Sequence, residues 1–445
     1  MSARSKNKTL IRGATVVTVD DEDRVLRADI LIENGRIQKL APRIPARGMD
    51  HVVEAKGLVA IPGFVQCHIH LCQTLFRGHA DDLVLLEWLA ERIWPMEAAL
   101  SADDLRASAR LGLAEIMLGG TTAVLDMGTV NHTEVLFEEA KRFGIRYTGG
   151  KCLMDQGHGF PSKLKESTED TIAGSVELCE KFHGTVGGRL RYAFSPRFVL
   201  SCSEEAMRRS VSEARARGAL LHTHASENSE EVDIVRERTG MGNVEYLHSI
   251  GFSGPDVLLA HGIWLSPSER KLLRETRTRI VHCPSANLKL ASGIARLADL
   301  MNEDIHLCLG ADGAACNNNL DAFVEMRFAA MLHKVRSGPT AVPASRALRL
   351  ATRDGALALG LDDCGSIQEG FCADITLLDL QKPHASPGNA NPISRIVYSA
   401  RASDVHSVFI DGRQVVDEGV LLPMKMPRIL KEANSASERI LKRAL

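Results

Sequence analysis

Apolar and polar residues alternate at both ends of the chain. Residues 10–40 form short apolar runs of this kind around an Asn-Gly pair at positions 34–35, and residues 371–416 repeat the pattern around an Asp-Gly pair at positions 411–412. Alternation with a period of two around such a dipeptide is typical of a β-hairpin. Unpaired strands would leave exposed edges, so we expect the two ends to pair into one small β-domain, a β-sandwich.

Between these ends, apolar runs alternate with segments of helical periodicity such as residues 102–118 and 203–217. This alternation predicts a parallel sheet covered by helices. The eight apolar runs end near His70, Asp126, Lys151, Phe198, Glu227, Gly262, Pro284 and Asp312. Eight strand-helix units predict an α/β protein with a (β/α)8 TIM-type barrel.

The same pattern divides the chain into domains. Residues 1–62 are expected to form the N-terminal part of the β-domain, residues 63–365 the barrel, and residues 366–445 the C-terminal part of the β-domain with a terminal helix. A chain of 445 residues suits a large barrel with an appended domain.

Composition limits the class of protein. Hydrophobic residues make up 44% and charged residues 25%, as in ordinary globular proteins, and the net charge is only -2. Without a basic stripe, we expect a small neutral substrate and no nucleic acid. Residues 1–8 lack a secretory pattern and no apolar run reaches the roughly 20 residues that cross a bilayer, so a cytoplasmic protein with no membrane partner is expected. We also expect a homo-oligomer, and reduced thiols for the ten cysteines, which include no CxxC pair.

Histidines and carboxylates gather where the predicted strands end. These residues are His68, His70, His222, His224, Glu227, His261 and Asp312. In a TIM-type barrel the carboxyl ends of the strands meet on one face, where the chemistry takes place. Residues two apart on a strand point the same way, so His68 and His70 present both imidazoles to one metal ion. Nitrogen and oxygen ligands suit zinc, the default, and also iron.

The ordered set of HxH, a second HxH followed by Glu three residues on, a later His and a closing Asp resembles the deaminase branch of the amidohydrolase superfamily. This resemblance implies one divalent metal per chain, with ligands His68, His70, His224 and Asp312. Binuclear members carry a bridging lysine at the end of the fourth strand, where this chain has Ser-Pro-Arg-Phe at residues 195–198.

The expected chemistry is hydrolytic deamination. A bound divalent metal lowers the pKa of its water and supplies hydroxide for attack on a ring carbon that bears an amino group. Glu227 is expected to protonate the adjacent ring nitrogen, while Asp312 and His261 shuttle protons until ammonia leaves. The alternatives are a helix-capping role for Glu227, a hydrogen-bonding role for His261, and a homologue that has lost activity.

Two stretches favour an aminopurine nucleoside as the substrate. Residues 73–97 and 312–321 are similar to the methylthioadenosine, S-adenosylhomocysteine and 5'-deoxyadenosine deaminases. In those enzymes a glutamate at the Glu97 position holds the ribose hydroxyls, a role that suits a two-site acceptor. Cys316, in the second stretch, is a further candidate for substrate contact.

Another stretch favours a bare base. Arg197 replaces the histidine of those families, and with Gln73 and Phe198 it resembles guanine deaminase, in which Gln, Arg and Phe grip the purine. Arg197 can donate hydrogen bonds to the ring and Phe198 can pack on it. We place Glu97 and Arg197 in different halves of the pocket and favour the nucleoside. A guanine or pterin-like deaminase is the first alternative, and an s-triazine chlorohydrolase or aminohydrolase the second.

Overall fold

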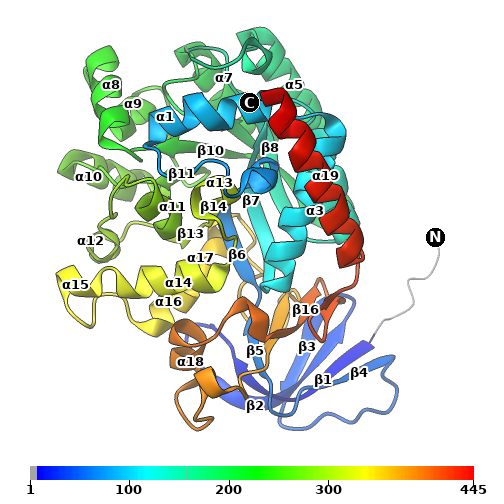
Figure 1. Cartoon of the computed structure of the whole chain (residues 1–445). Coiled ribbons are helices and arrows are strands. Elements are labelled where there is room, and N and C mark those ends of the chain that lie inside the picture. Colours follow the sequence, from blue (N-terminus) through cyan, green and yellow to red (C-terminus); the bar gives the residue numbers. More distant parts are fainter. Residues whose placement is uncertain (1–7, 158, 445) are drawn as a thin grey trace.

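A computed structural model describes residues 8–157 and 159–444 of the chain. The polar residues 1–7, part of the segment from which we predicted no secretory signal, lie outside the described residues. The structure consists of a barrel ringed by helices and a β-domain at one end of it (Figure 1).

The barrel strands follow one another in the order predicted for a closed parallel barrel. They are β6 (Phe64–His70), β7 (Thr121–Thr129), β8 (Arg146–Leu153), β9 (Leu190–Pro196), β10 (Leu220–Ala225), β11 (Val257–His261), β12 (Arg279–His282), β13 (Leu307–Leu309) and β14 (Asp312–Gly313). Residues 307–313 supply both β13, which pairs with β12, and β14, which pairs with β6, so the sheet closes on itself. The predicted TIM-type barrel is therefore confirmed.

The burial of the barrel strands explains why apolar runs in the sequence predicted them. Every residue of β6, β7 and β8 is buried, as expected for parallel strands with side chains on one face in the barrel and on the other under helices. Inside the barrel, Cys67, Leu258, Val281 and Cys308 belong to one apolar cluster. All ten cysteines of the chain are buried free thiols.

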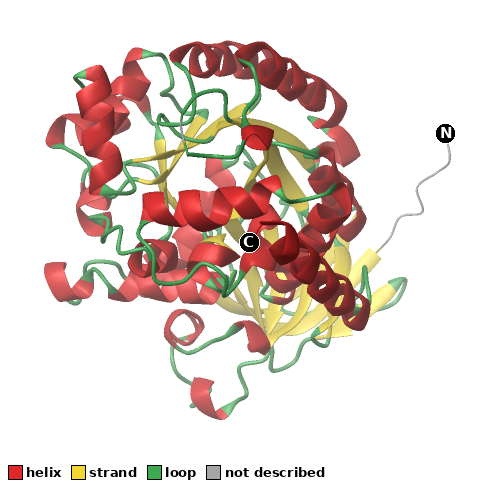
Figure 2. Cartoon of the chain, turned by 45° about the horizontal axis from the view of Figure 1, so that its top comes forward, coloured by secondary structure: helices red, strands yellow, loops and turns green. Residues whose placement is uncertain are grey.

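Helices surround the strand ring (Figure 2). Those of the barrel region are α1 (Leu85–Trp88), α2 (Trp94–Ala98), α3 (Ala102–Leu118), α4 (Glu134–Phe143), α5 (Thr168–Phe182), α6 (Thr185–Gly188), α7 (Glu204–Arg217), α8 (Ser229–Thr239), α9 (Asn243–Ser249), α10 (Pro267–Thr276), α11 (Pro284–Lys289), α12 (Leu297–Asn302), α13 (Ala314–Asn317), α14 (Ala322–Met331), α15 (Lys334–Ser337), α16 (Ala344–Ala351) and α17 (Arg353–Ala358). Short turns of 3-10 or π helix are η1 (Leu71–Phe76), η2 (Leu89–Ile93), η3 (Ser162–Leu164), η4 (Pro383–Ala385) and η5 (Ala402–Asp404).

Serine side chains start the two helices that were predicted from periodicity. Ser101 accepts a hydrogen bond from the Asp104 backbone N–H, and the Asp104 carboxylate accepts one from the Ser101 backbone N–H, which is a capping box at the start of α3. Ser203 caps α7 in the same sense by accepting from the Ala206 backbone N–H.

Both ends of the chain build the β-domain, as predicted. Its strands are β1 (Lys8–Val17), β2 (Val25–Glu33), β3 (Arg36–Ala41), β4 (His51–Glu54), β5 (Val59–Pro62), β15 (Ile375–Leu378), β16 (Val405–Ile410), β17 (Arg413–Asp417) and β18 (Val420–Leu421). They form one mixed sheet in which β5 joins the halves, because it pairs with β1 on one side and with β15 on the other.

Two further helices follow β15. They are α18 (Pro392–Tyr398) and α19 (Met426–Ala444). The terminal helix α19 lies along α3 on the outside of the barrel (Figure 1), where Arg439 and Arg443 donate to the buried Asp104 carboxylate. Within residues 8–157 and 159–444, none of the helices combines the length and apolar character needed to cross a membrane.

Candidate active site

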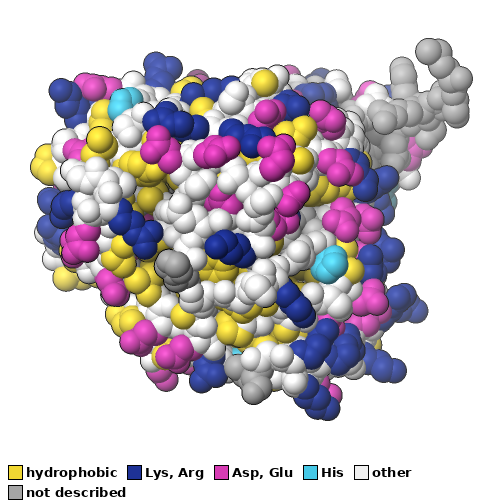
Figure 3. Space-filling view, turned by 90° about the horizontal axis from the view of Figure 1, so that it is seen from above, with side chains coloured by type: hydrophobic (Ala, Val, Ile, Leu, Met, Phe, Trp, Pro, Cys, Tyr) yellow, Lys and Arg dark blue, Asp and Glu magenta, His cyan; other side chains and the backbone are white. Residues whose placement is uncertain are grey.

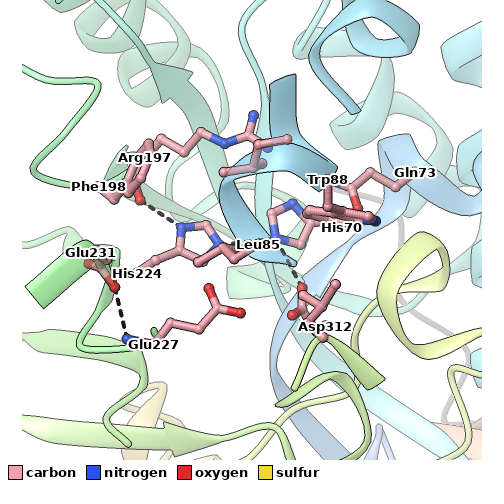
Figure 4. Close-up of a pocket in the computed structure, with 12 residues that line it drawn as sticks. His70, Gln73, Leu85, Trp88, Arg197, Phe198, His224, Glu227, Glu231 and Asp312 are labelled. Carbon is pink, nitrogen blue, oxygen red and sulfur yellow. Dashed lines mark hydrogen bonds and ion pairs between the residues drawn. The ribbon is translucent and has the colours of Figure 1, made fainter. Parts of the chain in front are cut away.

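The predicted chemistry-bearing residues meet at the carboxyl end of the barrel. His68 and His70 end β6, His222 and His224 lie on β10, His261 ends β11, and Asp312 opens β14. Glu227 follows β10 and is buried beside them. His70, His224, Glu227 and Asp312 point toward one another in the pocket shown in Figure 4.

The backbone is strained at three positions at this end of the barrel. Ser226, His261 and Asp312 have φ angles of 54°, 78° and 62°, in the left-handed region that residues other than glycine rarely adopt. Such conformations cost free energy, and they cluster where function fixes the backbone. The strain supports a functional rather than a purely structural role for this end of the barrel.

A chain of hydrogen bonds sets the tautomer of His68. The His222 Nδ1 atom lies 3.0 Å from the Leu258 carbonyl oxygen, which can only accept, so Nδ1 carries the proton and Nε2 is an acceptor. That Nε2 lies 2.8 Å from His68 Nδ1, which therefore donates. The other ring nitrogen, His68 Nε2, therefore carries a lone pair. It is buried, has no hydrogen-bond partner in the described chain and lies 3.4 Å from Asp312 Oδ1.

His224 is oriented in the same way. Its Nδ1 donates to the Arg197 carbonyl oxygen at 2.6 Å, so its Nε2 lone pair faces His70 Nε2 at 3.2 Å. His70 Nε2 lies 3.3 Å from Asp312 Oδ1. Burial lowers the pKa of His68, His70 and His224 well below the usual range, which keeps the imidazoles neutral and their lone pairs available.

These acceptor atoms fit a divalent metal ion. The Nε2 lone pairs of His68 and His224 and the Asp312 carboxylate oxygen, 3.4 Å from His68 Nε2, form an electron-rich cluster that a cation would stabilise. The potential ligand atoms of His68, His70 and Asp312 lie within 4.8 Å of one another, and so do those of His68, His224 and His261. Three imidazoles and a carboxylate are a donor set that zinc and iron accept.

Glu227 and His261 form the proton-handling part of the site. His261 Nε2 lies 3.3 Å from Glu227 Oε2 and 4.0 Å from Asp312 Oδ2. Burial and the neighbouring Asp312 carboxylate raise the pKa of Glu227 well above its usual range. Burial lowers the pKa of His261 to about 3. At neutral pH these pKa shifts favour a protonated Glu227 and a neutral His261.

The pocket wall contains three of the predicted substrate contacts. Gln73, Arg197 and Phe198 line the same pocket as the metal-site and proton-handling residues His70, His224, Glu227 and Asp312. Sequence reasoning gave no pocket role to several other lining residues, which are Leu85, Trp88, Leu89, Glu231 and Leu290. Leu85, Trp88 and Leu89 fall within residues 73–97, the stretch that resembles the nucleoside deaminases, whereas no pattern marked Leu290.

Glu97 lies beside Arg197 and not in a different half of the pocket, so that expectation is wrong. Its carboxylate accepts from Arg197 Nη1 at 2.6 Å and Nη2 at 3.2 Å, and from Gln73 Nε2 at 2.9 Å. A buried guanidinium needs a counter-charge, and the segment that runs through α1 and η2 into α2 brings Glu97 to it. Glu97 does not belong to the described wall of the cavity.

Cys316 is likewise absent from the described wall of the cavity. It is fully buried in α13, where its thiol donates to the Gly313 carbonyl oxygen at 3.1 Å. The geometry gives no support to a substrate contact by this residue.

Two deaminases are similar to this chain over nearly its whole length. A 5'-deoxyadenosine deaminase of Methanosarcina acetivorans is 37% identical over 437 residues, which cover 98% of this chain and 99% of that protein. A 5-methylthioadenosine/S-adenosylhomocysteine deaminase of Pelotomaculum thermopropionicum is 36% identical, with 98% and 99% covered.

Among solved structures, an adenosine deaminase from Xanthomonas campestris with bound zinc superposes with a TM-score of 0.91 at 30% identity, covering 98% of this chain and 99% of that one. The model of the amidohydrolase family matches residues 59–415, which include every strand of the barrel. The chain therefore belongs to the amidohydrolase family.

Proposed function

We propose that the protein is a metal-dependent hydrolytic deaminase that releases ammonia from an aminopurine nucleoside of the 5'-deoxyadenosine, methylthioadenosine or S-adenosylhomocysteine type. The observation that carries the proposal is the convergence of His70, His224, Glu227 and Asp312 on one pocket. Relatives that match nearly the whole chain at 36–37% identity bear the names of such deaminases. A cytoplasmic location and a homo-oligomeric state remain predictions from the sequence.

His68, His70, His224 and Asp312 would hold one divalent metal per chain, with zinc proposed and iron as the alternative. When bound, the metal supplies Lewis-acid activation of water at neutral pH. His222 would support it indirectly, because it fixes the tautomer of His68 through their 2.8 Å hydrogen bond.

Glu227 is the proposed proton donor to the ring nitrogen next to the amino-bearing carbon. Its raised pKa keeps a proton available at neutral pH, the property that a general acid needs. His261 Nε2, 3.3 Å from Glu227 Oε2, is close enough to exchange a proton with that carboxyl group, and Asp312 is the second proton acceptor. The Asn287 side chain, 2.9 Å from His261 Nδ1, holds the ring in place.

A substrate panel tests the proposal. Purified protein is incubated with 5'-deoxyadenosine, methylthioadenosine, adenosine, adenine, guanine and a pterin, and ammonia release is measured. We expect turnover of the adenine nucleosides, with adenine and guanine far slower. Turnover of guanine, with no turnover of the nucleosides, would favour a guanine deaminase instead. The observation that favours this alternative is that Gln73, Arg197 and Phe198 all line the cavity.

A further inference from the structure

The pocket has a polar floor and an apolar roof. The floor consists of the side chains at the strand ends, among them His224, Glu227 and Asp312. The roof is the segment of α1 and η2, from which Leu85, Trp88 and Leu89 line the pocket with 4%, 5% and 5% of their surface exposed. Leu85 and Trp88 are shown in Figure 4.

Among the described residues that line the pocket, no cation is left without a counter-charge. Arg197 supplies the one guanidinium of the described wall, and the Glu97 carboxylate neutralises it through two hydrogen bonds. Lys289 precedes the lining residue Leu290, but its ammonium group is bonded to Asp81, to Asn318 and to the Ala315 carbonyl oxygen.

The outer surface of the roof carries charges of both signs, with carboxylates in excess. It carries the exposed carboxylates Glu87 and Glu91 and the half-buried Arg92, which is not among the residues that line the pocket. The face of the molecule seen from above mixes acidic, basic and hydrophobic side chains (Figure 3). A carboxylate that enters beneath the roof therefore loses its hydration without gaining a counter-charge, which costs free energy.

We infer that Leu85, Trp88 and Leu89 make the site selective for adenine nucleosides with a short, uncharged 5' substituent, such as a 5'-deoxy or 5'-methylthio group, over S-adenosylhomocysteine. The inference rests on the proposed function. In an adenine nucleoside the amino-bearing carbon and the sugar-bearing nitrogen lie at opposite ends of the purine. With the amino end on the polar floor, the 5' substituent lies beneath the apolar roof, which stabilises a methyl or thioether group by contact.

Four nucleosides separate the charge of the 5' group from its length. The zinc-loaded protein is assayed with 5'-deoxyadenosine, methylthioadenosine, 5'-butylthioadenosine and S-adenosylhomocysteine. The butylthio arm matches the homocysteinyl arm in length and lacks its charges. We expect kcat/KM for butylthioadenosine within about tenfold of methylthioadenosine, and for S-adenosylhomocysteine at least about a hundredfold lower.

The outcomes distinguish the inference from the proposed function. Equal kcat/KM for S-adenosylhomocysteine and methylthioadenosine would overturn the inference and leave the deaminase intact. A butylthio compound as poor as S-adenosylhomocysteine would also overturn it, because length rather than charge would then be excluded. If none of the four nucleosides releases ammonia, the proposed function itself fails.

A roof variant and a matched control test the residues. Leu85→Ala is expected to lower kcat/KM for methylthioadenosine about tenfold and to leave S-adenosylhomocysteine nearly unchanged. Val84→Ala, one residue earlier and 45% exposed, should change neither value. Leu89→Ala repeats the test if the first variant folds poorly. An equal loss for both substrates in the roof variants would contradict the assignment.

Discussion

His222 shows at the scale of single residues how a side chain outside the pocket controls one inside it. Its Nδ1 proton is committed to the Leu258 carbonyl oxygen, so its Nε2 accepts from His68 and leaves the second nitrogen of His68 free to bind. The HxH pattern alone does not separate His222 from His224. The resemblance implied that His224 is the ligand, and the structure places His224 in the pocket wall.

Glu227 carries the first prediction. Glu227→Gln should lower kcat by roughly a hundredfold or more, because an amide cannot give up a proton as the buried acid does. Metal content should stay at the wild-type level, since Glu227 is not a proposed ligand. Steady-state kinetics and elemental analysis measure both quantities. Glu230→Gln, an exposed residue on the following helix, is the control, and full activity in Glu227→Gln would return Glu227 to a structural role.

The ion pair of Glu97 and Arg197 carries the second prediction. Glu97→Ala leaves a buried guanidinium without its counter-charge and should lower the free energy of unfolding by roughly 3–5 kcal/mol. The exposed pair of Glu204 and Arg208 provides the control, because Glu204→Ala should cost less than about 1 kcal/mol. Denaturant titration measures both.

The same variant should also impair every substrate. Because Arg197 and Gln73 both bond to Glu97, its removal disturbs the wall that would face a nucleoside or a bare base alike. A loss of kcat/KM confined to nucleosides, with unchanged stability, would mean instead that Glu97 contacts the ribose directly.

At the scale of elements, the predictions succeeded where burial is periodic. The two hairpins, α3 and all eight barrel strands follow patterns that local sequence displays. The short strands β4 and β5 were not predicted, although β5 joins the two halves of the β-domain. Its four residues are all buried, so it lacks the alternation that identifies a strand.

The contact between the two hairpin turns carries the third prediction. Gly35 has φ +83°, and a Cβ atom there would lie 2.8 Å from the Asp411 carbonyl oxygen in the other turn. Gly35→Ala should therefore cost at least about 2 kcal/mol, from backbone strain and from separation of the turns. Gly48 has a similar φ of +84° with nothing within 4 Å, so Gly48→Ala isolates the strain at about 1 kcal/mol. Equal losses in the two variants would show that the turns do not depend on their contact.

At the scale of the whole molecule, the sequence located the catalytic end of the barrel but not the complete pocket. Strand ends converge by the geometry of the fold, so histidines and carboxylates found there could be grouped in advance. The pairing of Glu97 with Arg197, a hundred residues apart, and the entry of Leu290 into the wall depend on how connecting segments fold back. Periodicity carries no information about such contacts.

The metal site should also couple to the stability of the whole chain, because its ligands come from β6, β10 and β14, which are far apart in the sequence. A ligand that binds only the folded state at a hundred times its Kd adds about 2.7 kcal/mol to the free energy of unfolding. Chelation should therefore abolish turnover and lower the Tm, and zinc or iron should restore both, with one metal per chain by elemental analysis. His68→Ala should lose this metal-dependent rise in Tm, whereas the control His248→Ala, at an exposed histidine, should keep it. Two metals per chain, or a Tm that chelation leaves unchanged in the wild type, would contradict a single site that ties the barrel strands together.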